Sequence, residues 1–179
     1  MALSLTIDGR FVEVPEGATV LEVVNRLGLP LPQLCKDPDR PPLGACRTCL
    51  VQVDGQRGFA ASCHLPARDG MVVRTDTPEV VRIRRAVLDL TRSMLAPSEG
   101  PGGFGQLGEA CLRHGLTALS WAPLHRFSVD DSKSFFVLDR EACVLCGRCT
   151  IACDDVQLIG AISLVGKGHA EKEIGRAHV

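Results

Sequence analysis

The chain has 179 residues, and its 20 basic and 21 acidic residues nearly cancel. This balance gives no reason to expect a nucleic-acid partner or an anionic membrane surface, and no apolar run approaches the ~18 residues that a membrane-spanning helix needs. Aromatic residues make up only 4% of the chain, whereas glycine and proline are abundant and there are nine cysteines. Such a composition suits small domains held together by bound cofactors better than one large core.

A β-hairpin followed by a helix is predicted at the beginning of the chain. Apolar and polar residues alternate over residues 3–14 on both sides of Asp8-Gly9, a pair that favours a type I′ turn. Thr19 and Glu22 have the spacing of a capping box, and apolar residues then continue at helical intervals until a glycine stops the helix.

Two more strands, at residues 50–53 and 71–74, complete the predicted N-terminal fold. A second Asp-Gly turn, Asp54-Gly55, follows the first of them. A helix lying across a mixed sheet would bury together the apolar residues Leu5, Ile7, Val12, Val20, Val24, Val51 and Val72. We therefore expect an α+β chain that begins with a β-grasp domain over residues 1–76.

Four cysteines of this domain form the first candidate site. They have the spacing Cys-x10-Cys-x2-Cys-x13-Cys and are Cys35, Cys46, Cys49 and Cys63. Four thiolates, two for each iron, are what a [2Fe-2S] cluster needs. Gly44 and Ala45 keep the loop side chains small, so that backbone N–H groups can point at the sulfurs.

Disulfides and structural zinc are the alternatives for these cysteines. The first residues lack a basic segment and Asp8 interrupts their apolar run, so we expect no signal peptide and a cytoplasmic chain, in which cysteines more often hold metal than form disulfides. Zinc sites usually pair two Cys-x2-Cys motifs, whereas one pair here is flanked by two single cysteines. The pattern favours an iron-sulfur cluster and leaves zinc or inert thiols as the other interpretations.

Residues 77–128 are predicted to form a short helical linker domain. Thr77-Pro78-Glu79 suits a helix start, and the expected apolar face consists of Val80, Ile83, Val87, Leu90 and Met94. The other faces carry four arginines that we interpret as solvated, namely Arg82, Arg84, Arg85 and Arg92.

A glycine-rich stretch over residues 97–108 is predicted to be a loop. It is not preceded by a strand and lacks the Lys-Ser/Thr ending of a phosphate-binding loop, so nucleotide binding is not expected there. Cys111 follows, with His114 and His125 as the other ligand types in this region. One thiolate and two imidazoles do not complete a cluster site, so we interpret Cys111 as packed within a helix.

A second set of cysteines lies in residues 129–172 and is more specific than the first. Its spacing is Cys-x2-Cys-x2-Cys-x3-Cys, and its members are Cys143, Cys146, Cys149 and Cys153. This is the bacterial ferredoxin motif for a [4Fe-4S] cluster, in which the fourth cysteine ligates a different cluster. No cysteine follows Cys153, so each of the two clusters lacks ligands and the ferredoxin domain is incomplete.

The last seven residues, 173–179, are expected to be non-native. Their sequence, Glu-Ile-Gly-Arg-Ala-His-Val, reads as the translation of a common sequencing-library adapter. We therefore expect the chain to be a fragment of a longer protein, and the codons for these residues test this.

Residues 3–76 resemble the ferredoxin-type [2Fe-2S] domain that opens the large iron-sulfur subunits of complex I, NAD-dependent formate dehydrogenases and iron-only hydrogenases. The four spaced cysteines and the segment Gly-Ala-Cys-Arg-Thr-Cys carry this resemblance. Related subunits often have a His-x3-Cys-x2-Cys-x5-Cys site in the linker, which is degenerate here. A cysteine at the position of Cys153, followed by Asp-Asp-Val-Gln and Gly-Ala-Ile, looks like the formate dehydrogenase alpha subunit.

The resemblance implies an iron-sulfur segment of a multi-subunit oxidoreductase. It would relay electrons from formate oxidation at a molybdenum or tungsten pterin domain to flavin and NAD-reducing subunits, with no catalytic residues of its own. The alternatives are a complex I-like NADH dehydrogenase, a diaphorase or a hydrogenase subunit, or a free-standing, non-catalytic ferredoxin-like adaptor. A zinc-bound interaction module is a third class. No direct membrane insertion is expected.

Overall fold

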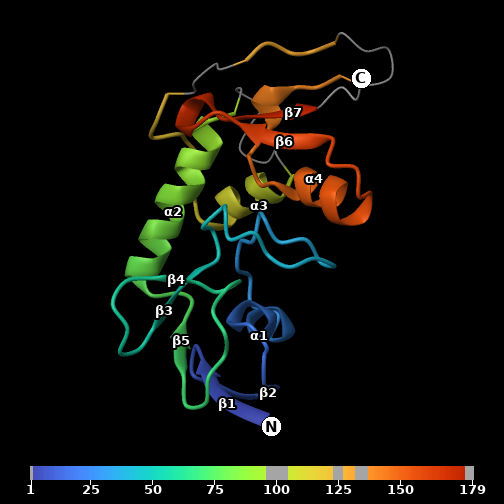
Figure 1. Cartoon of the computed structure of the whole chain (residues 1–179). Coiled ribbons are helices and arrows are strands. Elements are labelled where there is room, and N and C mark those ends of the chain that lie inside the picture. The colour runs from blue at the N-terminus through green and yellow to red at the C-terminus, as the bar shows by residue number, and fades with distance from the viewer. Residues whose placement is uncertain (1, 96–104, 123–126, 132–136, 176–179) are drawn as a thin grey trace. The chain divides into compact units, whose positions relative to one another are not determined.

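The computed structural model describes residues 2–95, 105–122, 127–131 and 137–175. The chain divides into two compact units, Met1–Leu88 and Asp89–Val179, and each is described by itself (Figure 1). The predicted boundaries at residues 76 and 128 stay a prediction.

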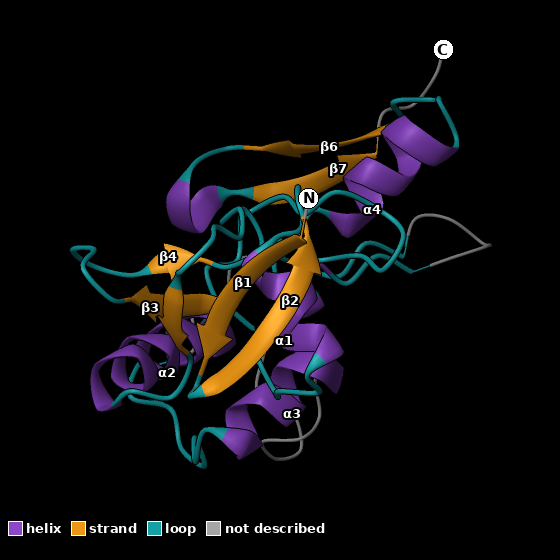
Figure 2. Cartoon of the chain, turned by 90° about the horizontal axis from the view of Figure 1, so that it is seen from below, coloured by secondary structure: helices purple, strands orange, loops and turns teal. Residues whose placement is uncertain are grey.

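The first unit is a mixed five-stranded sheet with a helix packed on it. Its strands are β1 (Ala2–Ile7), β2 (Arg10–Pro15), β3 (Leu50–Val53), β4 (Ala60–Ala61) and β5 (Val72–Arg74), arranged in the order β2-β1-β5-β3-β4. β1 and β5 run parallel, and the other neighbours are antiparallel. Helix α1 (Val20–Arg26) shares one core with the sheet (Figure 2). This is the predicted α+β arrangement, although β4 was not expected.

The hairpin turns and the first helix begins at the residues that the sequence predicts. Asp8 and Gly9 both have positive φ, 48° and 78°, as a type I′ turn requires. The Thr19 hydroxyl accepts from the Glu22 N–H at 3.3 Å, and the Glu22 carboxylate accepts from the Thr19 N–H at 2.7 Å, which completes the capping box. These local signals fix the path of the chain up to the first cysteine.

The predicted core is confirmed for five of its seven members. Leu5, Ile7, Val20, Val24 and Val51 are buried, and Val12 packs partly buried against them. Val72 is only half-buried, and its neighbour Val73 fills the core instead. The reason is the register of the parallel pair, which sets Val73 beside Ile7 on the inner face, so that Val72 points away.

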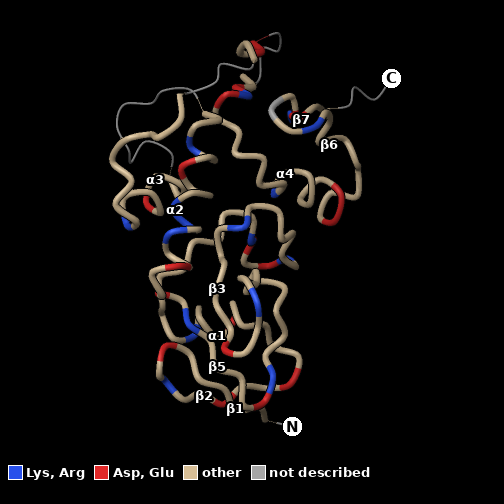
Figure 3. Tube along the Cα trace, turned by 90° about the vertical axis from the view of Figure 1, so that its left-hand side faces the viewer, with Lys and Arg blue, Asp and Glu red and all other residues tan. Residues whose placement is uncertain are grey.

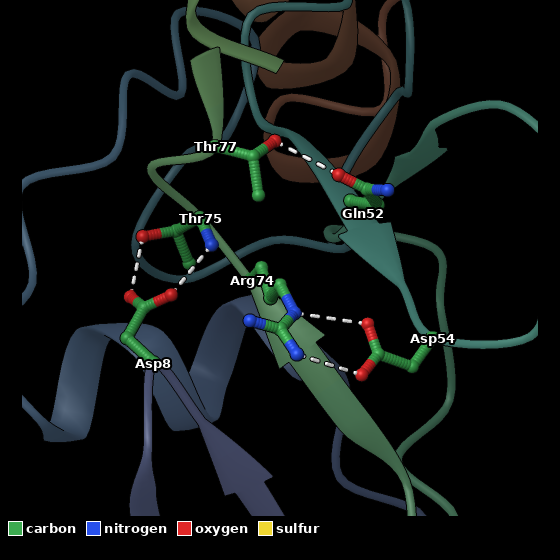
Figure 4. A network of polar contacts seen from close by, with 6 residues as sticks. All are labelled: Asp8, Gln52, Asp54, Arg74, Thr75 and Thr77. Atoms are coloured by element: carbon green, nitrogen blue, oxygen red, sulfur yellow. Dashed lines mark hydrogen bonds and ion pairs between the residues drawn. The ribbon is translucent and has the colours of Figure 1, made fainter. Parts of the chain in front are cut away.

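Polar contacts tie the end of β5 to its neighbours (Figure 4). The Asp8 carboxylate accepts from the backbone N–H and the hydroxyl of Thr75 at 2.7 and 2.6 Å. Arg74 forms a two-bonded ion pair with Asp54, both distances being 3.0 Å, and this exposed pair lowers the pKa of Asp54 through its hydrogen bonds. The hairpin turn therefore fixes the position where the chain leaves the sheet.

Helix α2 (Pro78–Ser93) confirms the predicted helix but only part of its predicted buried face. Thr77 caps it by accepting from the Val80 N–H at 3.3 Å. Leu90, expected in the apolar face, is 50% exposed, whereas Arg84, expected in solvent, is only 3% exposed. Val80, Arg84 and Leu88 are spaced four apart and lie on the buried face. Burial of Arg84 is possible because backbone carbonyls accept from its guanidinium.

The second unit contains short elements. They are α3 (Gly105–Arg113), a 3-10 turn (Arg140–Ala142), α4 (Arg148–Ile151), a π-helical turn (Ala152–Val156), β6 (Ile162–Val165), a second 3-10 turn (Gly168–Ala170) and β7 (Lys172–Gly175). Residues 105–108 were expected in a loop and instead begin α3, and the rest of that predicted loop, 97–104, lies outside the described residues. Leu138 and Asp130 form an isolated antiparallel bridge.

The β6–β7 hairpin includes part of the segment expected to be non-native. Glu173, Ile174 and Gly175 pair with residues of β6, and the Glu173 carbonyl accepts from the Arg140 guanidinium at 3.1 Å. Backbone pairing does not depend on the origin of these residues, so their non-native origin stays a prediction to be checked on the coding DNA.

Charges are spread along the described chain rather than gathered in one segment. Acidic and basic positions are interspersed along the tube in Figure 3, in line with the near-zero net charge. Within the ranges that the structure describes, no helix is long and apolar enough to cross a membrane.

Candidate metal centres

The first candidate centre surrounds the N-terminal end of β3. Cys49 immediately precedes that strand, and the pairing of Leu50 with Ala61 places Cys63 beside it. The Cys49 carbonyl accepts from the N–H and the hydroxyl of Ser62 at 3.1 and 2.8 Å. Cys35 and Cys46 come from the long connection between α1 and β3. All but the half-buried Cys46 are 2% exposed.

The four thiols gather as two hydrogen-bonded pairs. In one pair, a hydrogen bond from Cys35 lowers the pKa of Cys46 to about 5, and the same bond raises the pKa of Cys35. In the other, a hydrogen bond from Cys63 lowers the pKa of Cys49 to about 6 and raises that of Cys63. The charges of Cys49, Cys35 and Cys46 also raise the pKa of Cys63, so the two pairs lie close enough to interact. The structure therefore brings all four predicted residues together.

Left-handed backbone shapes the loop around these sulfurs. Gly44 has φ +68° and Arg47 has φ +55°, a conformation that is strained for arginine. A Cβ on Gly44 would lie 2.9 Å from Nε2 of His64, so this position needs glycine for space as well as for conformation. The backbone N–H groups of Cys46 and Ala45 hydrogen-bond the Cys35 sulfur and partly offset the rise in its pKa from Cys46 and from burial. The small loop residues Gly44 and Ala45 therefore allow backbone N–H groups to face the Cys35 sulfur, as the sequence predicts.

Thr48 is a polar side chain of this site that sequence reasoning missed. It is fully buried, and its Oγ1 lies 3.1 Å from the Cys46 sulfur and 3.4 Å from the Leu34 nitrogen. Because the oxygen accepts from the Leu34 N–H, its own hydrogen is available to donate to the Cys46 thiolate. Its place between the two close cysteines was a signal in the sequence, but its inward direction follows from the turn at Arg47.

This donor set fits a two-iron cluster better than a structural zinc ion. Among the described residues, no three His, Cys, Asp or Glu side chains converge to hold one metal ion. The thiols come in twos, which is the number that each iron of a [2Fe-2S] cluster takes from four cysteines, whereas a structural zinc ion takes four ligands at one point.

The second candidate centre is more open. Cys143 and Cys146 are half-buried and Cys149 is exposed. Partial desolvation raises the pKa of Cys149, and the charges of Glu173, Cys143 and Cys146 raise it further, so the three thiols are neighbours. Leu145, at φ +54°, turns its N–H toward the Cys143 sulfur at 3.4 Å. The three predicted residues are thus brought into one loop.

Cys153 has different surroundings from the other three. It is buried in the π-helical turn, and its sulfur accepts from the Ala161 N–H at 3.1 Å. Gly147, at φ +73°, is the residue that precedes α4 and lies between Cys146 and Cys149. The separate hydrogen bond of Cys153 agrees with a motif whose fourth cysteine serves another cluster.

Cys111 is buried in α3, as expected for a packed cysteine, and burial raises its pKa. The ring of His114 contacts the Ala110 carbonyl through Nδ1 at 2.8 Å. His125 is outside the described residues. All nine cysteines are described, and none of them forms a disulfide.

Comparison with known proteins shows what the chain is similar to. Residues 1–78 match the family model described as a 2Fe-2S iron-sulfur cluster binding domain. The chain is 35% identical over 94% of its length to an NADH-quinone oxidoreductase subunit from Streptomyces coelicolor, and spans 22% of that protein. It is 32% identical over 93% of its length to an NADP-reducing hydrogenase subunit from Solidesulfovibrio fructosivorans, and spans 30% of it.

A solved structure extends the likeness to most of the chain. A chain in the crystal structure of an NAD+-reducing [NiFe]-hydrogenase in its H2-reduced state superposes with a TM-score of 0.86 at 28% sequence identity, covering 97% of this chain and 74% of the other. The likeness is therefore to subunits of an NADH-quinone oxidoreductase and an NADP-reducing hydrogenase, and to a chain of an NAD+-reducing hydrogenase. Formate dehydrogenase is not among these relatives by name.

Proposed function

We propose that the chain is an electron-transfer segment in which Cys35, Cys46, Cys49 and Cys63 hold a [2Fe-2S] cluster. The observation that carries the proposal is the gathering of these thiols as two interacting pairs in a buried loop. Such a cluster, when bound, supplies transfer of one electron at a time. The match of residues 1–78 to a cluster-binding family supports the same conclusion.

The chain's own residues bind the cluster, exclude water and set the local charge. Burial of three of the cysteines keeps solvent from the sulfurs. The Thr48 hydroxyl and the backbone N–H groups near Gly44 donate to sulfur, and such donors favour the reduced state because they stabilise negative charge.

A [4Fe-4S] cluster at Cys143, Cys146 and Cys149 is the second part of the proposal, with Cys153 serving a further cluster. The shared loop of the first three thiols and the separate hydrogen bond of Cys153 support it. Two clusters in one chain form a relay rather than a reactive pocket.

The parent enzyme is proposed to be a nicotinamide-linked oxidoreductase with flavin and NAD-reducing partner subunits. The relatives named above favour a complex I-like or hydrogenase assembly. Formate oxidation at a pterin domain is the finer proposal, supported by Cys153 and the residues after it. A cytoplasmic location belongs to the same proposal, since the absence of disulfides at all nine cysteines suits a reducing compartment.

Metal analysis of the anaerobically purified chain tests the proposal. We expect iron and acid-labile sulfide in excess of zinc, and an electron paramagnetic resonance signal of a two-iron cluster after reduction with dithionite. Stoichiometric zinc without labile sulfide would instead identify an interaction module. Sequencing the full-length gene then decides the parent, because a pterin domain, a hydrogen-cluster domain and an early stop are distinct outcomes.

A further inference from the structure

A buried arginine lies behind the first centre. Arg84 on α2 is 3% exposed, and its Nη2 donates to the Leu50 carbonyl at 2.7 Å and to the Thr75 carbonyl at 2.9 Å. Leu50 follows Cys49 directly, and both are buried. The guanidinium is therefore fixed within the protein interior at the strand end that carries a cluster cysteine.

The positive charge of the Arg84 guanidinium lies in the protein interior, which screens charge poorly. Burial lowers the pKa of Arg84, and the Cys49 thiolate, followed by Asp8 and Asp76, acts in the opposite direction. Arginine stays protonated in proteins, so the site contains a permanent cation whose strongest charged neighbour is a cluster cysteine. Charges in the interior act over longer distances than charges on the surface.

We propose that Arg84 is a positioning and tuning residue for the [2Fe-2S] cluster, which raises its reduction potential by placing a buried positive charge beside the Cys49 end of the cluster. The inference rests on the proposed function. Four thiolates give the bound cluster a net negative charge, and reduction adds one electron and one further negative charge. A nearby fixed cation therefore stabilises the reduced state more than the oxidised state.

The structure offers a purely mechanical alternative, because the same two hydrogen bonds fasten α2 to the ends of β3 and β5. A fastening role predicts a loss of stability on substitution and no systematic change in potential. A charge role predicts a change in potential that tracks the charge at residue 84.

Potentiometric titration of the whole chain, followed by the two-iron resonance signal, separates the two roles. Arg84→Gln should lower the ratio of reduced to oxidised cluster at a fixed potential by about tenfold, which is about 59 mV for a one-electron couple. Arg85→Gln is the matched control, since it removes the same charge one residue further along α2 at an exposed position, and its potential should stay at the wild-type value. Equal potentials in Arg84→Gln and wild type, or equal shifts in both variants, overturn the inference.

Arg84→Lys decides the matter if the glutamine variant does not fold. A buried lysine has a lowered pKa and loses its charge within an accessible range. Its potential should match the wild type at about pH 6 and fall below it by about pH 10. Potentials that run parallel at every pH overturn the inference. Absence of the two-iron signal from the wild-type chain would contradict the proposed function instead.

Discussion

The two cysteine sites differ in how much of the fold supports them. The first is enclosed by a sheet, a helix and a buried core, and three of its four cysteines are 2% exposed. The second lies among short helical turns, and only Cys153 of its four cysteines is buried. The comparison teaches that a strong motif and a well-enclosed site are separate properties, since the more specific spacing belongs to the more open loop.

Removal of one thiol from the first site should give the largest effect. Cys63→Ala should abolish the two-iron resonance signal, because Cys63 and Cys49 form one of the two pairs, and should leave the four-iron signal in place. Cys111→Ala is the control, since Cys111 is buried in α3 and belongs to neither cysteine motif in the sequence. Retention of the two-iron signal in Cys63→Ala would contradict the ligand assignment.

The rate of iron release should differ between the two sites, and this is the second-largest expected effect. With a chelator under anaerobic conditions, we expect the four-iron centre to lose iron roughly tenfold faster than the two-iron centre, because its thiols are reached without opening a core. The measurement is the decay of each resonance signal with time. Release at one common rate would mean that the enclosure seen around Cys35 and Cys49 gives no protection.

Gly44→Ala should weaken the first site by a smaller amount. The left-handed φ and the contact with His64 together cost about 1–3 kcal/mol, which lowers the Tm of a unit this size by roughly 5–15 °C. Gly55→Ala is the matched control, because Gly55 has φ +78° and nothing within 4 Å of a Cβ. The excess loss in Gly44→Ala measures the contact with His64, and the double variant with His64→Ala should remove that excess.

The smallest effect is expected at Thr48. Thr48→Val keeps the shape but removes the hydroxyl that faces Cys46, so the potential of the two-iron centre should fall by less than about 59 mV, or tenfold in the ratio of reduced to oxidised cluster. Thr48→Ser keeps the hydroxyl and should stay near the wild type in the same titration. A lower potential in both variants would point to packing rather than to the hydrogen bond.

Local signals in the sequence predicted most of the first unit. The Asp8-Gly9 turn, the Thr19 capping box and the strand at 50–53 depend on neighbouring residues, and all are found. The buried face of α2 was predicted only in part, because Val80 is buried as expected but Arg84 was assigned to solvent by its charge and is buried. Arg84 lies four residues from both Val80 and Leu88, and this spacing could have indicated that it is buried. The carbonyls that accept hydrogen bonds from Arg84, however, lie far away in sequence.

The sequence predicted which residues belong to the candidate sites, but not the structure that surrounds those residues. Spacing picked out the four cysteines of the first site and the three of the second site that the structure gathers. The β6–β7 hairpin and the π-helical turn at Cys153 have no short-range pattern that identifies them. Ser62 and His64 contact the first loop from further along the chain, and the Leu34 N–H that orients Thr48 is also distant in sequence, so spacing does not encode these contacts.

The parallel pairing of β1 with β5 has a consequence for synthesis of the chain. Thr6 pairs with Val72, so the central strands of the sheet meet only after the whole cysteine loop has left the ribosome. Contacts between such distant residues close late, since a long loop must first be ordered. A nascent chain that ends before Val72 therefore carries all four thiols outside a finished sheet, and enclosure of the first centre is among the last events of folding.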